Sequence, residues 1–397
     1  MNSTRLYRVS ILYWRPRAAP STCRTFATKE CTLKNPRDPL RILFCGSDEF
    51  SIYSLVYLKK LQLKSPSIIA SIDVVCRPGK RVGRGLKEIR DVPIKAVANE
   101  LSLPVHEIDT FRGWNPPRPK GEPINLIVAV SFGLFVPPRI LKGAKYGGLN
   151  VHPSLLPDFR GPAPLHHALL AGDKTFGVTV QTLDLKYFDR GLILAQTPKP
   201  GDPIPPTLDQ FLPLAAENGA NMLTRVIRGR FYESPEKFAT PIVEEGSLRH
   251  APKITLHDRH IDWETWTWDV ISRRFKTLGS LWNFATAHPP NPKGTDVSPI
   301  QKRVRLMKLN LIDPQTIGIT TGTSIEPGRP FSWSNSQISK GDVARPLYVF
   351  TCQGELIQIE EINVESRKSS AALGSALRGR LIEPLTGPLS KFHETLH

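Results

Sequence analysis

Short apolar runs and amphipathic stretches alternate along the first half of the chain. Apolar runs at residues 40–44, 68–76 and 124–130 have the length and composition of buried strands. Helix-like stretches at 50–61 and 93–101 lie between them, and a fourth strand-like run ends in Asn150 and His152. This alternation predicts an α/β fold with a parallel, helix-covered sheet. A further helix is expected from Pro162 or Pro164 to about Ala171, ended by Gly172.

Asn150 and His152 end the fourth predicted strand, which is where open α/β sheets bind their ligands. Residues two apart on a strand point to the same face, so the carboxamide and the imidazole project together. Acyl transfer needs such a pair, because negative charge builds on the carbonyl oxygen while the nucleophile loses a proton. We expect Asp189, in a loop between the strand-like runs 177–183 and 192–196, to orient the imidazole.

Several segments in this half also carry a family resemblance. Residues 150–157, Asn-Val-His-Pro-Ser-Leu-Leu-Pro, resemble a motif of the folate-dependent formyltransferases, and five other segments keep that family's order: 40–50, 77–85, 129–137, 160–164 and 189–191. The ordered resemblance covers about residues 40–230 and is fainter beyond residue 250. Within the family, the sequence is most similar to the branch that acts on methionyl-tRNA. It implies a Rossmann-like, mostly parallel formyltransferase domain followed by a smaller β-rich, OB-like domain.

The resemblance also implies a reaction and its substrates. The formyl donor would be 10-formyltetrahydrofolate as a cosubstrate, without a metal, and the acceptor the α-amine of initiator methionyl-tRNA. Asn150, His152 and Asp189 would be catalytic, and we expect a monomer. The slot for the folate would be lined by Val130, Phe132, Gly133, Phe135, Ser154, Leu155, Leu156 and Pro157.

Residues 77–90 form a strongly basic segment. It carries six Lys or Arg residues against one acid, Glu88, which favours contact with phosphates, although a solvated basic loop has the same composition. The family resemblance favours RNA contact over a solvated loop. The methionyl-tRNA branch has a basic insertion here with an Arg between two glycines, as at Arg84. The expected RNA contacts are Lys80, Arg81, Arg84 and Lys87, with Lys302, Arg303 and Arg305 in the C-terminal half.

The C-terminal half predicts a small β-rich module. A helix is expected at 267–278, and the strand-like run around 302–311 has an alternation that slips once, as at a β-bulge. Residues 346–351 and 356–364 are separated by Cys-Gln-Gly-Glu and predict a β-hairpin. From these patterns we expect four parts: a leader at 1–39, a catalytic domain at 40–230, a linker at 231–249 and a tRNA-binding domain at 250–385.

Composition and charge narrow the class of protein. No apolar run reaches about 18 residues, so membrane insertion is not expected. The five cysteines lack metal-ligand spacing. The sequence has no Gly-x-Gly-x-x-Gly after its first strand and no Walker pattern, so binding of NAD or ATP is not predicted. Residues 1–29 hold six bases, several Ser and Thr and no acid, which is typical of a mitochondrial transit peptide, and the expected destination is the matrix. Residues 1–40 carry eight bases and two acids, which leaves +11 of the net +17 for the rest.

Three other functions remain open at this stage. A folate formyltransferase acting on glycinamide ribonucleotide or an amino sugar would share the catalytic residues, but the basic segment and the C-terminal module argue against it. Hydrolysis of 10-formyltetrahydrofolate could use the same three residues with water as acceptor. A catalytically inactive RNA-binding protein would need none of the three side chains.

Overall fold

The computed structural model describes residues 38–83, 85–240, 248–287, 300–319, 326–333, 346–365, 370–372, 375–376 and 389–391. Residues 1–37 of the predicted leader, residue 84, residues 241–247 of the predicted linker and parts of the C-terminal half therefore lie outside the described residues. The described residues contain two large sheets, each with its own hydrophobic core. We describe the two separately.

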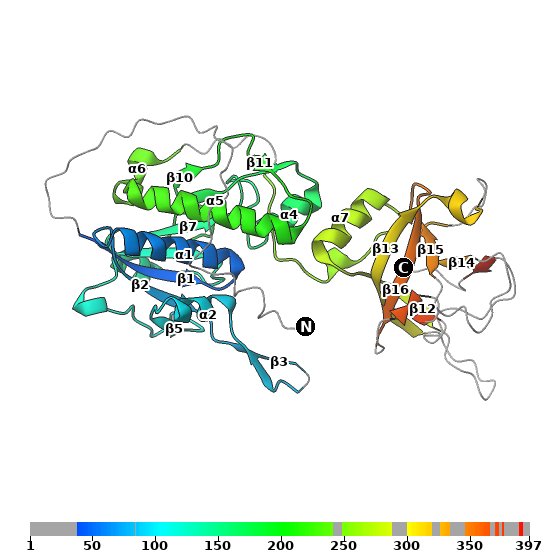
Figure 1. Cartoon of the computed structure of the whole chain (residues 1–397), viewed down its shortest axis with the longest axis horizontal. Coiled ribbons are helices and arrows are strands. Elements are labelled where there is room, and N and C mark those ends of the chain that lie inside the picture. Colours follow the sequence, from blue (N-terminus) through cyan, green and yellow to red (C-terminus); the bar gives the residue numbers. More distant parts are fainter. Residues whose placement is uncertain are drawn as a thin grey trace. The chain divides into compact units, whose positions relative to one another are not determined.

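The first sheet has seven strands in the order β10-β9-β7-β6-β1-β2-β5 (Figure 1). Strands β5, β2, β1, β6 and β7 are parallel, while β9 is antiparallel to both of its neighbours, β7 and β10. The predicted mostly parallel sheet is confirmed. Its strands are β1 Leu40–Gly46, β2 Ile69–Cys76, β5 Val105–Glu107, β6 Leu126–Val130, β7 Gly148–His152, β9 Thr179–Thr182 and β10 Ile193–Gln196.

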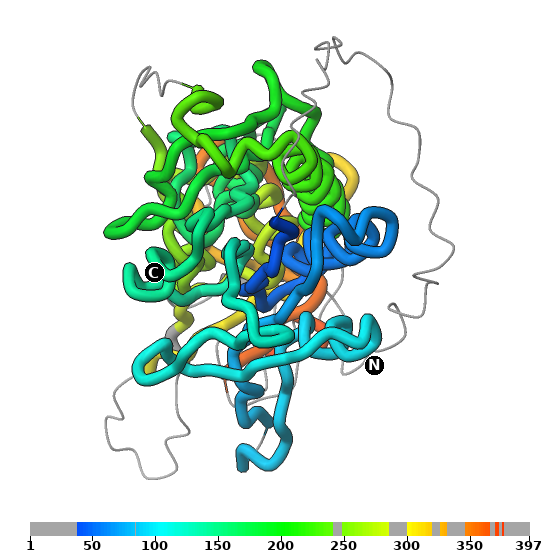
Figure 2. The backbone as a smooth tube through the Cα atoms, turned by 90° about the vertical axis from the view of Figure 1, so that its left-hand side faces the viewer, coloured from blue at the N-terminus to red at the C-terminus, as the bar shows by residue number. Residues whose placement is uncertain are grey.

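Two short antiparallel pairs lie outside this sheet. β3 Lys80–Val82 pairs with β4 Glu88–Arg90, and β8 Thr175–Phe176 pairs with β11 Asp202–Pro203. The β3–β4 hairpin extends away from the sheet in both views (Figures 1 and 2). Lys80, Arg81 and the three residues of β4 are exposed, and Val82 is half-buried.

Helices cover one face of the first sheet, where α1 and α5 lie side by side (Figures 1 and 2). α4 begins with a proline and ends at Gly172, whose φ of 76° is the left-handed conformation that glycine adopts readily, as predicted. α5 was not predicted, because it contains Pro213 and follows a proline-rich segment. The helices are α1 Glu49–Lys64, α2 Pro93–Glu100, α3 Pro138–Gly143, α4 Pro164–Ala171, α5 Leu208–Arg228 and α6 Pro235–Phe238, with 3₁₀ turns at Pro119–Gly121 and Phe231–Glu233.

Alternation along β7 decides what each face of the sheet contacts. Leu149 and Val151 are buried in the core that includes residues of α1, α4 and α5. Asn150 and His152 point to the opposite face, the one on which Ala129 packs with α3. The larger core also includes Tyr232 and Ala251, both beyond the boundary predicted at residue 230.

The second sheet is antiparallel and has the order β12-β13-β16-β15-β14-β18, with β17 beside β16. α7 Trp268–Leu278, the bulge in β13 near Leu306, and the hairpin of β15 and β16 confirm three sequence predictions. The strands are β12 Leu281–Ala287, β13 Ile300–Ile312, β14 Phe331–Trp333, β15 Leu347–Phe350, β16 Leu356–Val364, β17 Ser370–Ala371 and β18 Leu389–Lys391, with 3₁₀ turns at His257–Arg259 and Pro314–Ile317. In the described parts of the chain, no helix combines the length and apolarity that crossing a bilayer requires.

Candidate active site

Asn150 lies between two strands that hold its carboxamide. In the sheet register it is opposite Ala129 of β6 and Gln181 of β9. Its Nδ2 donates to the carbonyl of Ala129 at 2.9 Å, and its Oδ1 accepts from Nε2 of Gln181 at 3.0 Å. The bond to Ala129 takes one of the two Nδ2 hydrogens, and within the described residues the other has no protein acceptor. Asn150 therefore retains one N–H donor at the carboxyl end of the sheet.

His152 is buried, with 7% of its side chain exposed. Its Nε2 lies 3.0 Å from the carbonyl oxygen of Phe159, and its Nδ1 lies 3.5 Å from Oδ1 of Asp189. Both neighbours are hydrogen-bond acceptors. The two ring nitrogens of His152 therefore face two oxygen atoms, one from the main chain and one from a carboxylate.

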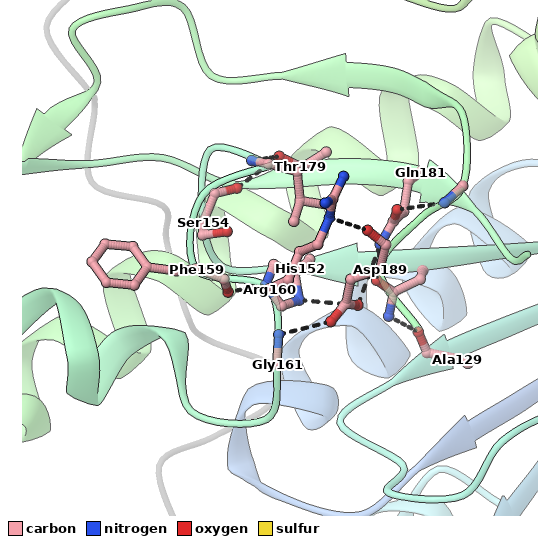
Figure 3. Close-up of polar contacts among 12 residues, drawn as sticks. Ala129, His152, Ser154, Phe159, Arg160, Gly161, Thr179, Gln181 and Asp189 are labelled. Carbon is pink, nitrogen blue, oxygen red and sulfur yellow. Dashed lines mark hydrogen bonds and ion pairs between the residues drawn. The ribbon is translucent and has the colours of Figure 1, made fainter. Parts of the chain in front are cut away.

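Asp189 is held by contacts to its carboxylate and to its main chain. Oδ2 accepts from the backbone N–H of Gly161 at 2.9 Å, and Oδ1 lies 3.4 Å from Nε2 of Gln181. The carbonyl oxygen of Asp189 accepts from Nε of Arg160 at 3.0 Å. Its φ of 55° is unusual for a residue with a side chain, and these contacts hold the strained conformation in place. Figure 3 shows Asp189 turned toward His152.

Gln181 is a member of this cluster that the sequence did not single out. It is 1% exposed, and it joins Asn150 to Asp189 through its Nε2. Its Oε1 accepts from the backbone N–H of Gly191 at 3.1 Å. The alternation in residues 177–183 shows which side chains share a face. Only the register of β9 against β7 shows that Gln181 is the one opposite Asn150.

Gly161 is required where the loop after β7 meets Asp189. Its φ is 126°, and a Cβ there would lie 2.4 Å from the carbonyl oxygen of Ala251. We expect Gly161→Ala to lower stability by about 1–3 kcal/mol and to reduce turnover, because the loop must shift and the bond to Asp189 lengthens. Thermal unfolding and steady-state kinetics test this. The expectation is wrong if both stay at the wild-type values, and Gly113→Ala, with nothing within 4 Å of the added Cβ, is the control for left-handed backbone strain alone.

The predicted folate residues fall into two groups. Val130, Phe132, Ser154 and Leu156 are buried, so most of their side chains are already in contact with protein. Those with more exposure are Gly133, Phe135, Leu155 and Pro157. The loop that carries Gly133 and Phe135 follows β6, next to the strand of Asn150 and His152.

Phe135 contacts two features beside the cluster. Its ring meets Phe188, the neighbour of Asp189, edge-on at 5.2 Å between ring centroids. It also lines an open pocket of about 430 Å³, together with Thr110, Phe111, Arg112, Gly113, Leu134, Pro137 and Arg139. Of the predicted folate residues only Phe135 lines this pocket, and the side chains of Asn150, His152 and Asp189 do not.

The predicted RNA contacts of the first half lie on or beside the β3–β4 hairpin. Lys80 and Arg81 are exposed on β3, and Lys87 is exposed in the connecting turn. Arg90 is opposite Lys80 in the register, which places a further exposed cation on the same hairpin. Arg84 lies outside the described residues.

The three predicted RNA contacts of the C-terminal half are all on β13 but do not share a face. Arg303 and Arg305 alternate with the buried Val304, whereas Lys302 lies on the same side of the strand as Val304. The guanidinium of Arg303 lies over the ring of Trp282 at 5.9 Å, and Arg305 donates to Asn363. The structure therefore brings two of the three together.

Comparisons with known proteins place this geometry in a family context. Residues 40–227 match the family model described as formyl transferase. The mitochondrial methionyl-tRNA formyltransferase of Saccharomyces cerevisiae is 32% identical over 302 residues, covering 67% of this chain and 74% of that protein. The human mitochondrial methionyl-tRNA formyltransferase is 32% identical over 308 residues, covering 76% and 71%. A crystal structure of an N-formyltransferase from Helicobacter canadensis aligns with a TM-score of 0.46 and 14% identity, over 81% of this chain and 98% of that one.

Proposed function

This chain belongs to the formyl transferase family of enzymes, and from that premise we propose that it formylates the α-amine of initiator methionyl-tRNA. The proposed donor is 10-formyltetrahydrofolate. The observation that carries the proposal is the cluster of Asn150, His152 and Asp189 at the carboxyl ends of the strands. Gln181 hydrogen-bonds to Asn150 and Asp189, and His152 lies against Asp189. The relatives named above support the choice of acceptor, and the basic hairpin gives a second reason for an RNA substrate.

The first step is attack of the uncharged α-amine nitrogen on the formyl carbon. The new C–N bond turns the formyl oxygen into an oxyanion, and the amine nitrogen becomes positively charged. The second Nδ2 hydrogen of Asn150 is the direct donor to this oxygen. His152, when protonated, adds the positive charge of its ring from beside the oxyanion, because its two ring nitrogens face Phe159 and Asp189.

The second step removes a proton from the attacking nitrogen and breaks the bond from the formyl carbon to N10 of the folate. Asp189 accepts the amine proton, directly or through a water molecule. As the oxyanion re-forms the carbonyl, the electron pair of the broken bond goes to N10. N10 takes up the proton that Asp189 accepted from the amine, or one from water, and leaves as tetrahydrofolate. Asp189 also holds the imidazole in place, which links the two roles through one carboxylate.

Binding of the folate is proposed for the loops on either side of the cluster. The half-exposed Phe135 and Leu155 offer apolar contacts to the pterin, while the backbone of 130–136 and 154–157 offers hydrogen-bonding groups. The buried Val130, Phe132, Ser154 and Leu156 contribute shape and main-chain atoms more than free side chains. The edge contact of Phe135 with Phe188 connects this slot to the loop of Asp189.

Binding of tRNA is proposed for the hairpin and for β13. We expect Lys80→Ala with Arg81→Ala to raise KM for the tRNA with little change in kcat, because exposed cations neutralise phosphates without touching the reacting atoms. Removing one cation that neutralises a phosphate should reduce the salt slope of log Kd by about one. Filter binding at a series of salt concentrations measures this slope.

A matched control uses two exposed lysines away from the hairpin. Lys64 ends α1 and Lys237 lies in α6, and their double replacement by alanine removes the same charge. If that control changes the salt slope as much as the hairpin variant, only net charge matters and the hairpin is not the binding site. Arg84→Ala and Arg303→Ala with Arg305→Ala extend the same test to the other proposed contacts.

We further propose that the enzyme acts in the mitochondrial matrix, at the start of organellar translation. The basic, acid-free composition of residues 1–29 and the mitochondrial relatives support this location. Fusing residues 1–39 to a fluorescent reporter tests it. Import of the fusion into mitochondria is expected, and a reporter that stays in the cytosol would contradict the assignment.

The acceptor is tested by supplying the full chain and 10-formyltetrahydrofolate with one acceptor at a time. Formylmethionyl-tRNA is the expected product. Equal or faster formylation of glycinamide ribonucleotide or an amino sugar nucleotide would assign a different acceptor. Formate release without any added acceptor, at a rate matching tRNA formylation, would assign a hydrolase.

A further inference from the structure

Gln181 connects the proposed catalytic groups without lying at the end of a strand itself. It is on β9, directly opposite Asn150 in the antiparallel register with β7. Residues opposite each other in such a pair project to the same face of the sheet. The register therefore makes the two carboxamides neighbours. The side chain is 1% exposed, so each of its polar atoms needs a partner inside the protein.

The direction of the Gln181 amide is fixed by a backbone group. The N–H of Gly191 can only donate, and it lies 3.1 Å from Oε1 of Gln181. The oxygen therefore faces Gly191, and Nε2 faces the cluster. No larger residue fits at position 191, because a Cβ on Gly191 would lie 1.7 Å from the carbonyl oxygen of Thr182.

The two hydrogens of Nε2 serve two different catalytic groups. One is directed to Oδ1 of Asn150 at 3.0 Å, and the other to Oδ1 of Asp189 at 3.4 Å (Figure 3). A donor on Oδ1 of Asn150 turns the other end of that amide, Nδ2, toward Ala129 and the reaction slot. The bond from Gln181 to Asp189 is made to Oδ1, the oxygen that also faces Nδ1 of His152, while Gly161 donates to Oδ2. Both oxygens of the carboxylate are thereby held, and Oδ1 can accept from Gln181 and face His152 at the same time.

We infer that Gln181 is a positioning residue for formyl transfer, which sets the Asn150 amide as an oxyanion donor and fixes the Asp189 carboxylate against His152. The inference rests on the function proposed above and names a residue that acts through Asn150 and Asp189. Gln181 does not touch the substrate in this account. Its contribution is to keep both groups in the orientation that the transition state needs.

Two substitutions separate positioning from ordinary structural support. Gln181→Met keeps the length of the side chain and removes all of its hydrogen bonds. Gln181→Glu keeps the shape and can still accept from Gly191, but it places a second oxygen against Oδ1 of Asn150 and of Asp189. A role confined to the bond with Gly191 predicts that Glu is the milder change for kcat, because Glu keeps that bond and Met does not. Positioning of Asn150 and Asp189 predicts that Glu is the more damaging one, because its second oxygen repels both of their oxygens.

The experiment measures kcat and KM for formylation of methionyl-tRNA by the full chain, with thermal unfolding of each variant. We expect Gln181→Met to lower kcat by about 10–100-fold, with both KM values within about twofold of wild type. Gln181→Glu should be slower still, by about another tenfold. Asn125→Ala is the matched control, because this buried amide bonds to Arg41 and Pro39 at the other end of the sheet and should change stability but not kcat.

The result that overturns the inference is a Gln181→Glu enzyme at least as active as Gln181→Met. If Gln181→Glu does not fold, the kinetics of Gln181→Met decide alone, and a kcat equal to that of Asn125→Ala overturns it. Asn150→Ala in the same series separates a failure of the positioning role from a failure of the proposed function. Wild-type turnover that is lost in Asn150→Ala but kept in both Gln181 variants refutes only the positioning role, while a wild type that formylates no tRNA refutes the proposed function.

Discussion

Replacing Asn150 with alanine should lower kcat for formyl transfer by on the order of a hundredfold to a thousandfold, the usual cost of losing one oxyanion donor. The reason is that Asn150 holds one N–H toward the carboxyl end of the sheet while its other groups are fixed by Ala129 and Gln181. KM for both substrates should change little, because the donor acts on charge that exists only in the transition state. Pre-steady-state formylation with saturating substrates measures the step itself.

Two further variants make the Asn150 result specific. Asn150→Asp keeps the shape but replaces the N–H groups by oxygen, so it should be at least as slow as Asn150→Ala. Asn125→Ala removes a buried amide remote from the cluster and should retain wild-type kcat. An Asn150→Asp enzyme with near-wild-type turnover would remove Asn150 from the role of oxyanion donor.

Asp189→Asn is the second change with a large expected effect, a loss of kcat on the order of a thousandfold, within the range of general-base catalysis. The substitution keeps the size of the side chain and an oxygen for the N–H of Gly161, but it removes the negative charge beside His152. It therefore removes both the proposed proton acceptor and the carboxylate that faces the ring of His152. Steady-state kinetics with thermal unfolding as a check on folding give the result.

Asp184→Asn is a matched control for Asp189→Asn in the same loop. Oδ1 of Asp184 accepts from the backbone N–H groups of Lys186 and Tyr187, and an asparagine can accept in the same way. Its kcat should stay within about twofold of wild type, because the half-buried carboxylate bonds to the backbone of its own turn. Equal losses in both variants would mean that the charge of the loop matters and that Asp189 has no individual role.

Those parts of the site that depend on local sequence could be predicted. Asn150 and His152 are two residues apart at a strand end, so their shared face and their place in the sheet follow from strand geometry. Asp189 was predicted from its loop between two strand-like runs and from the family resemblance, and the structure brings it to His152. The helix at 164–171 was predictable because its first residue and its C-cap both carry sequence signals.

The contacts that support these residues were not predictable from one sequence. Gln181 is identified only by the register of β9 on β7, and Gly161 only by the path of the loop that passes Ala251. Register is set by tertiary packing, which a local pattern does not contain. For α5 the local signal was misleading, because the burial of its apolar face outweighs the cost of Pro213.

The basic residues could likewise be predicted only in part from the sequence. The basic segment at 77–90 was visible from composition, and the structure presents Lys80, Arg81 and Lys87 on an exposed hairpin. Composition could not tell that Lys302 lies on the other face of β13 from Arg303 and Arg305, because that depends on which residues of the strand are buried. The RNA-binding variants should therefore pair Arg303 with Arg305.

The most direct measurement of the central claim is a single-turnover assay of formyl transfer from 10-formyltetrahydrofolate to methionylated initiator tRNA, with the wild-type chain and Asn150→Ala side by side. The account predicts formylmethionyl-tRNA from the wild type and a rate lower by on the order of a hundredfold or more in the folded variant. Equal rates from the two proteins, or no formylated tRNA from a wild type that still consumes the formyl donor, would contradict it.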